Sequence, residues 1–309
     1  MQMAINSRLF ITGRITLDCY ARNEAFKFSN LQRYEQIQSS GIFLGGSAGN
    51  IAAWLHKLRQ PVLLYGAIGQ DNIGRTITEI IAQQGIPFFP QYTQTQSSMS
   101  IIFLDDRGEP LFFHVPGANN DFELNFIPDD FKPNDILVIA GLQLLPNLNK
   151  RWEDFYYNLN RKPPFIVASM CHGGEPGLYY PILNNTNILV GNREETEPYL
   201  HDPDLFTRFS CLQAIVMTEG KQRVSIILPS SSISVDVTPV KVIDACGAGD
   251  SFLAGLLAGL NCGQDLEISC KLGIRLSGEC CQRVGPSCPP DNLYEDITRA
   301  FPWLMELAK

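Results

Sequence analysis

The chain has 309 residues, 18% of which are charged, and its formal net charge at pH 7 is −8. This length suits a single α/β domain over residues 1–309, and the acidic balance argues against broad binding to nucleic acid or to anionic membranes. No segment has the length of a membrane span and no secretory leader is evident, so the sequence predicts a cytoplasmic protein.

Short apolar segments alternate with helix-length segments along most of the chain. The predicted strands are Leu9–Gly13, Val62–Tyr65, Ile136–Ala140, Phe165–Ala168, Ile188–Val190 and Ala214–Thr218. This alternation favours a doubly wound, mainly parallel sheet with helices on both faces. In such folds ligands bind at the carboxyl ends of the strands, and the motifs described below all follow predicted strands.

A strand-to-helix turn is predicted where the apolar Ile42–Leu44 is followed by Gly45 and Gly46. A helix with apolar residues on one side follows at residues 51–58. Asn50 would lie in its first turn, where the side-chain amide can both donate to and accept from a polyol. A plain tight turn followed by a polar helical residue fits the same pattern.

Two polar motifs follow strands in the middle of the chain. Asn192 and Glu195 come directly after Ile188–Val190, and their spacing is that of a helix N-cap with glutamate at the third helical position, a relative of the capping box. Thr218 and Gly220 end the next strand. The spacing alone does not distinguish a capped helix from a ligand site.

The most informative stretch is residues 244–252, where Gly247, Ala248 and Gly249 precede Asp250 at the start of an apolar helix. Small residues let an anion approach the unpaired N–H groups of the first helical turn, where the helix dipole favours negative charge. A carboxylate there cannot attract an anion, so Asp250 is better explained as a base that takes a proton from a hydroxyl group. An ordinary capped helix start also fits these residues.

Taken in this order, the motifs resemble those of the ribokinase-like (PfkB) family of carbohydrate and nucleoside kinases. Residues 244–250 are similar to its C-terminal signature, with Ala245 where a threonine is usual. Residues 45–53, followed by residues 66–74, are similar to its N-terminal signature. The resemblance implies a ribokinase-like fold.

The resemblance also implies roles for individual residues. Asp250 would be the catalytic base. The backbone N–H groups of Ala248, Gly249 and Asp250 would stabilise the phosphoryl group in transfer, and Gly247 would allow its approach. Other implied contacts are with the acceptor at Asp18, Gly45, Gly46, Asn50 and Gln143, with ATP at Asn192, Thr218, Gly220 and Gly285, with Mg²⁺ through water at Glu195, and with a monovalent cation such as K⁺ at Asp244.

Residues 19–43 and 98–115 interrupt the alternation of strands and helices, and the second stretch has the pattern of two strands around Asp105–Gly108. In the family a small β lid comes from these regions, closes over the acceptor and in several members forms a dimer contact. The resemblance therefore implies a lid and a homodimer contact through it. Edge structure on the main sheet is the alternative interpretation of both stretches.

The expected activity is transfer of the γ-phosphoryl group of ATP to a primary hydroxyl of a small sugar. A nucleoside is the alternative acceptor, and ribose is disfavoured because Gln143 stands near the place of a sugar-binding glutamate of ribokinases. A non-catalytic sugar or nucleotide sensor on the same fold is a different class of function. A dehydrogenase is disfavoured, since the spacing of Gly66 and Gly69 does not match the dinucleotide fingerprint.

Overall fold

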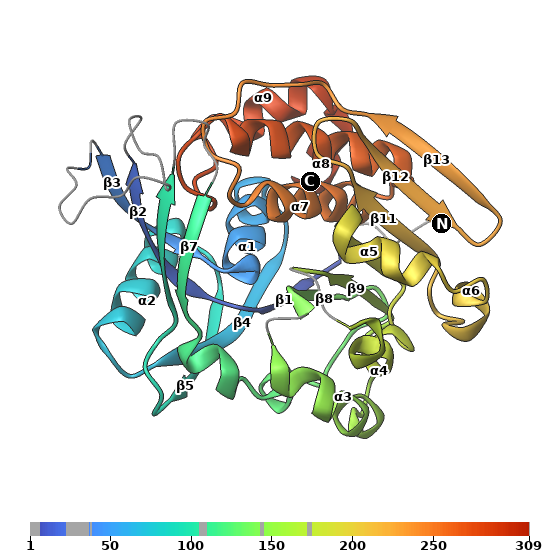
Figure 1. The fold of residues 1–309 in the computed structure, drawn as a ribbon, viewed down its shortest axis with the longest axis horizontal. Coiled ribbons are helices and arrows are strands. Elements are labelled where there is room, and N and C mark those ends of the chain that lie inside the picture. The colour runs from blue at the N-terminus through green and yellow to red at the C-terminus, as the bar shows by residue number, and fades with distance from the viewer. Residues whose placement is uncertain are drawn as a thin grey trace.

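The main sheet of the protein has nine strands (Figure 1), in a computed structural model that describes residues 7–22, 37, 39–104, 110–142, 145–171 and 175–308. The strand order is β13-β12-β11-β10-β9-β8-β1-β4-β5. Their bounds are β1 Leu9–Gly13, β4 Val62–Gly69, β5 Phe88–Thr93, β8 Ile136–Ala140, β9 Phe165–Ser169, β10 Ile188–Asn192, β11 Ala214–Thr218, β12 Arg223–Leu228 and β13 Ser231–Asp236. All pairs are parallel except those that β12 makes with β11 and β13. The predicted doubly wound, mainly parallel sheet is confirmed.

Helices cover both faces of this sheet. The helices that pack into one core are α1 Ser47–Lys57, α2 Asn72–Gln84, α7 Ala248–Asn261, α8 Leu266–Cys281 and α9 Leu293–Ala300. Those that pack into the other are α3 Pro146–Asn158, α4 Tyr180–Leu183, α5 Arg193–Leu200 and α6 Leu205–Arg208. Short 3₁₀ helices lie at Gly117–Asp121, Leu124–Phe126, Pro176–Tyr179 and Pro302–Ala308.

The two cores arise from the alternation of side chains along buried strands. In β1, Leu9 and Ile11 belong to the core beneath α1 and α7, whereas Phe10 belongs to the core beneath α3 and α4. Successive side chains of a strand point to opposite faces, so a continuous apolar run is what a strand covered on both sides requires. Because the strands are packed on both faces, the positions of their carboxyl ends are fixed.

A second, smaller sheet stands apart from the first, at the left of Figure 1. Its order is β3-β2-β6-β7, with β2 Thr16–Arg22, β3 Ser39–Gly45, β6 Met99–Leu104 and β7 Pro110–Val115. β2 and β6 are parallel and the other two pairs are antiparallel. The two stretches that interrupt the alternation thus form a separate small sheet and not edge strands of the main one, although residues 23–36, 38 and 105–109 lie outside the described part of the chain.

Helices α7 and α8 pack unusually closely because glycines face each other at their contact. A Cβ at Gly255 would lie 2.6 Å from the Cα of Gly273, and a Cβ at Gly273 would lie 2.7 Å from the carbonyl oxygen of Phe252. Any side chain at these positions would therefore push the two helices apart. The contact fixes α7, whose N-terminus lies at the cavity described below.

We predict that Gly255→Val lowers the free energy of unfolding by about 2 kcal/mol or more, because the added methyl groups overpack the contact between α7 and α8. Gly177→Val is the control, since a Cβ at Gly177 meets no atom within 4 Å. Denaturant unfolding of both variants checks this. Equal stability of the two would contradict the assigned packing.

Candidate active site

A cavity of about 560 Å³ lies between the carboxyl ends of the central strands and the small sheet. Side chains from β9, β10 and β11 line one side, and side chains from β2, β6 and β7 line the other. The N-terminal turns of α1 and α7 also reach the cavity. It therefore lies where the strands of an open α/β sheet end, which is the expected place for a ligand.

The N-terminus of α7 supplies backbone donors to this cavity. Gly247 caps the helix with φ 76°, a left-handed conformation that favours glycine. Within the described part of the chain, the amides of Gly249 and Asp250 have no protein acceptor. The amide of Ala248 lies 3.3 Å from the carbonyl oxygen of Ala245, so it is already engaged in the turn. The role expected of Ala248 stays a prediction, and the two following amides are the ones that face no protein acceptor in the described chain.

Asp250 lies at the head of α7 and borders the cavity. Asn50 donates from Nδ2 to Oδ2 of Asp250 over 2.7 Å, and the Ser47 hydroxyl also bonds to this carboxylate. Burial raises the pKa of Asp250 to about 6, and the nearby charges of Asp18 and Glu195 act in the same direction, while the two hydrogen bonds oppose the shift. A carboxylate with this pKa is ionised at neutral pH and is a stronger base than an exposed one.

Asn50 is buried, with 5% of its surface exposed. Its Oδ1 atom has no hydrogen-bond partner among the described residues. A buried amide oxygen without a partner is costly to the fold. Because Asn50 lines the cavity, this oxygen is placed to accept a hydrogen bond from a hydroxyl group bound there.

Asp18 is a buried carboxylate of the cavity, 5% exposed. Thr16 donates from Oγ1 to its Oδ1 over 2.6 Å, and Ser100 also bonds to it. Burial raises the pKa of Asp18 to about 6.

Gly45 does not line the cavity; instead, a Cβ there would lie 2.1 Å from the carboxyl carbon of Asp18, so glycine makes room for this side chain. Gly46 lines the cavity and begins α1 at φ 77°.

Asn192 and Glu195 form a complete capping box at the start of α5. The Glu195 amide donates to Oδ1 of Asn192 over 3.0 Å, and the Asn192 amide donates to Oε2 of Glu195 over 2.8 Å. Both residues also line the cavity. The capped helix start that the spacing allowed is therefore present, and the same box holds the Glu195 carboxylate at the cavity wall.

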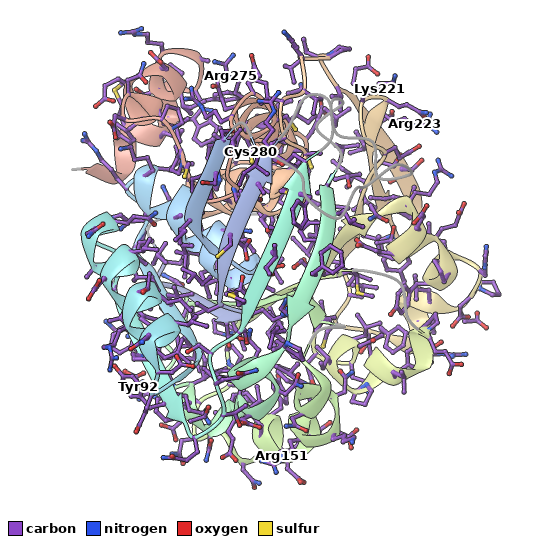
Figure 2. The ribbon with its side chains drawn as sticks, turned by 60° about the vertical axis from the view of Figure 1, so that its left-hand side comes forward. Tyr92, Arg151, Lys221, Arg223, Arg275 and Cys280 are labelled. Atoms are coloured by element: carbon purple, nitrogen blue, oxygen red, sulfur yellow. The ribbon has the colours of Figure 1, made fainter. Side chains whose placement is uncertain are left out.

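The turn between β11 and β12 lies next to Thr218, which lines the cavity. Glu219 accepts from Arg193 over 2.5 Å, from Arg223 over 3.0 Å and from Ser225 over 2.6 Å. These hydrogen bonds from two guanidinium groups and a hydroxyl lower the pKa of Glu219 to about 2. Figure 2 shows Arg223 at this turn. Gly220 lies in the turn, at φ 57°, and is not among the cavity-lining residues.

Four of the predicted site residues that the structure describes do not line the cavity, namely Gly45, Gly220, Asp244 and Gly285. The buried Asp244 carboxylate accepts from the amides of Cys246 over 2.8 Å and of Gly285 over 3.0 Å, so it joins two loops and does not line the cavity. The roles expected of Asp244 beside a monovalent cation and of Gly285 beside ATP stay predictions. Gln143 lies outside the described residues.

The cavity-lining residues that sequence reasoning missed include Arg14, Ser47, His114 and Cys171. Arg14 directly follows the predicted strand β1, so the rule that ligands bind at the carboxyl ends of strands could have found it. Ser47 lies within the motif of residues 45–53, whereas nothing in the segments around His114 and Cys171 marks these two residues. Cys171 is a neutral thiol, because burial and the charges of Asp250 and Glu195 raise its pKa to about 12 against the opposing charge of Arg14.

No group of three or more His, Cys, Asp or Glu side chains within the described ranges is placed to hold a metal ion. Among the described residues there is also no helix both long and apolar enough to cross a membrane.

Comparison with known proteins gives concordant matches. The model of the pfkB family carbohydrate kinases matches residues 6–292. An uncharacterized sugar kinase of Archaeoglobus fulgidus is 24% identical over 246 residues, which cover 75% of this chain and 95% of that protein. A nucleoside kinase of Methanocaldococcus jannaschii is 25% identical over 266 residues, covering 84% of this chain and 85% of that protein. The crystal structure of ribokinase from Thermotoga maritima has a TM-score of 0.76 at 17% identity and covers 96% of this chain and 100% of that one.

We predict that Asp250→Asn makes the protein more stable at pH 7.5. Because burial raises the pKa of Asp250 from 3.8 to about 6, the folded state binds more protons than the unfolded state between these values, and stability falls as the pH rises through this window. Removing the buried charge should raise Tm by roughly 2–4 °C. The control is Asp154→Asn, which changes net charge equally at an exposed position in α3. An equal or lower Tm for Asp250→Asn would contradict the assigned burial.

Proposed function

Because this chain belongs to the pfkB family of carbohydrate kinases, we propose that it transfers the γ-phosphoryl group of ATP to a primary hydroxyl group of a small sugar. The observation that carries this proposal is the pair formed by Asn50 and Asp250 at the heads of two helices, beside amides that have no partner in the described chain. A base, a polyol contact and an anion site meet in one cavity.

In the proposed reaction, the acceptor hydroxyl lies against Asp250, which takes its proton as the oxygen attacks the γ-phosphorus. Asn50 holds the carboxylate through Nδ2 and offers Oδ1 to a hydroxyl of the sugar. The amides of Gly249 and Asp250 stabilise the negative charge on the phosphoryl group, with the positive end of the α7 dipole behind them. Asp18 binds further hydroxyls of the acceptor.

The residues of the cavity fit a magnesium ion that arrives with the nucleotide. Mg²⁺ usually keeps several waters and binds one or two carboxylates together with substrate phosphates, and Glu195 is a single carboxylate held at the cavity wall. When bound, the ion would screen the charge of the β- and γ-phosphates. Thr218 and Asn192 lie on the same side of the cavity as Glu195, and we assign the nucleotide to this side. Contacts of the nucleotide with Gly220 and Gly285 remain part of the proposal.

We propose a sugar as the acceptor. A nucleoside is the alternative, which the similarity to a nucleoside kinase supports. A non-catalytic sensor is less consistent with the site, because binding alone does not need a basic carboxylate at the anion site. A cytoplasmic location remains part of the proposal.

The small sheet is proposed to act as a lid and as a dimer contact. One of its faces, with Asp18, Ser100 and His114, lines the cavity. The registers place Ile42, Cys19, Ile101 and Phe113 side by side across the sheet on its other face. Ile42 is 59% exposed, Ile101 39% and Phe113 54%. An apolar row of this kind is typical of a surface that another protein covers, and we propose a second copy of this chain.

We predict that Asp250→Asn abolishes ADP formation and leaves the affinity for the nucleotide within about tenfold, because the base acts on the acceptor and not on ATP. ADP release and equilibrium binding of a non-hydrolysable ATP analogue measure the two effects. Asp154→Asn is again the control and should match the wild type. A comparable loss of nucleotide binding in Asp250→Asn would show that the assigned role is wrong.

We also predict that Ile101→Asp combined with Phe113→Asp shifts the protein from dimer to monomer in sedimentation velocity runs, since charges at the centre of an apolar contact are costly. Phe126→Asp is the matched control, because Phe126 is 45% exposed and lies outside the small sheet. A wild-type protein that stays monomeric at high micromolar concentration would contradict the proposed dimer and leave the proposed catalysis untouched.

A further inference from the structure

Arg14 is a buried cation in the cavity whose purpose the proposed reaction does not explain. It follows β1 directly, lines the cavity and is 8% exposed. Within the described ranges no carboxylate lies within 4.0 Å of its guanidinium, whereas other arginines of the chain, such as Arg8 and Arg193, do form ion pairs. Its Nη2 atom contacts both ring nitrogens of His114 in β7.

The nearest acidic group does not act as an ion-pair partner for Arg14. Asp18 is close enough for the two charges to influence each other, but its carboxylate accepts hydrogen bonds from Thr16 and Ser100 instead. The pKa of Asp18 stays raised to about 6 despite the positive charge nearby, and burial lowers the pKa of Arg14. Both shifts indicate that the two groups are desolvated without pairing closely.

A buried guanidinium without an anionic partner is costly, and binding an oxyanion would offset this cost. The guanidinium is planar, keeps its charge and presents paired donors that match the two oxygens of a carboxylate. Arg14 is therefore suited to a ligand that carries such a group into the cavity.

The position of Arg14 assigns that group to the acceptor and not to the nucleotide. His114 joins Arg14 to Ser100, with 3.1 Å between Nδ1 and the Ser100 hydroxyl, and Ser100 in turn bonds to Asp18. These residues belong to the small sheet and to the connection between β1 and β2. Glu195 and Thr218, on the proposed nucleotide side, come from β10–α5 and β11.

The charge balance favours a carboxylate over a phosphate. Asp18, Glu195 and Asp250 already line the cavity, and the nucleotide adds the charge of its phosphates. A single guanidinium can balance one monoanionic carboxylate, whereas a phosphate monoester close to two negative charges would add uncompensated charge.

We propose that the acceptor is a sugar acid whose carboxylate pairs with Arg14 while one of its hydroxyl groups lies at Asp250. This inference rests on the proposed kinase function. In the step, the hydroxyl oxygen forms a bond to the γ-phosphorus, the bond from that phosphorus to the β,γ-bridging oxygen breaks, and its electron pair leaves with ADP. The hydroxyl proton goes to Asp250.

The test measures ADP release by the full-length chain with magnesium and ATP. The acceptors are aldonic and ketoaldonic acids, the neutral sugars of matched carbon skeleton, their phosphate monoesters, and nucleosides. We expect kcat/KM for the best acid to exceed that for its neutral counterpart by about tenfold or more, the value of one charge-assisted hydrogen bond. A neutral sugar, a sugar phosphate or a nucleoside as the best acceptor would overturn the inference and leave the kinase function standing.

The variant for this test is Arg14→Gln, with Arg14→Lys as the conservative change. Arg14→Gln should lower kcat/KM for the acid by about 10- to 100-fold, mainly through KM, and change it little for the neutral sugar. Arg14→Lys should restore part of the loss. An equal drop in kcat for acidic and neutral acceptors would overturn the inference, because Arg14 would then act on the phosphoryl group.

The control variant is Arg151→Gln. Arg151 pairs with Glu123 at the surface, and neither residue lines the cavity. Figure 2 shows Arg151 at the edge of the molecule. If Arg14→Gln fails to fold, the wild-type acceptor profile and the thermal shift that each acid and its neutral counterpart cause still decide the inference. If no acceptor gives ADP above the Asp250→Asn blank, the proposed function itself fails, and the inference fails with it.

Discussion

The arrangement of three carboxylates around one cavity is the constraint on which this site depends. Asp18, Glu195 and Asp250 line a space of about 560 Å³ that, in the proposed function, must also admit the phosphates of a nucleotide. Burial raises the pKa of Asp18 and of Asp250, and at Asp250 the charges of Asp18 and Glu195 act in the same direction. The protein offsets the repulsion with the N-terminus of α7, with the hydrogen bond from Asn50 and with the nearby charge of Arg14.

The fold holds these mutually repelling carboxylates in place through packing contacts that lie outside the cavity. Gly255 and Gly273 bring α8 against α7, and Trp54 of α1 donates from Nε1 to the carbonyl of Pro286 over 2.8 Å. The carbonyl of Pro286 belongs to the loop that also touches Gly247. The heads of α1 and α7 are thus fixed relative to each other, and the 2.7 Å bond between Asn50 and Asp250 follows from that packing. Desolvation of the Asp18 and Asp250 carboxylates destabilises the fold, which is consistent with a functional site.

Much of the fold could be predicted, because the central strands are buried on both faces and appear as continuous apolar runs. The turns before α1 and α7 could be predicted as well, because small residues directly before an apolar helical pattern indicate a turn into a helix. Arg14 was missed because a lone arginine after a strand is common, and its burial depends on β7, about a hundred residues further along the chain. The engaged amide of Ala248 and the loop-joining role of Asp244 depend on local geometry that residue types do not specify.

The pH profile of kcat/KM, measured with the best acceptor for the wild type and for Asn50→Ala, tests the central claim most directly. The profile reports the pKa of the essential base in the free enzyme, and activity should fall as the pH drops through about 6, where Asp250 takes up a proton. Asn50→Ala removes the hydrogen bond that stabilises the ionised form, so the acidic limb should move to higher pH. A limb that stays in place would assign the titration to another group, such as Asp18, and a profile without a limb would contradict general base catalysis by Asp250.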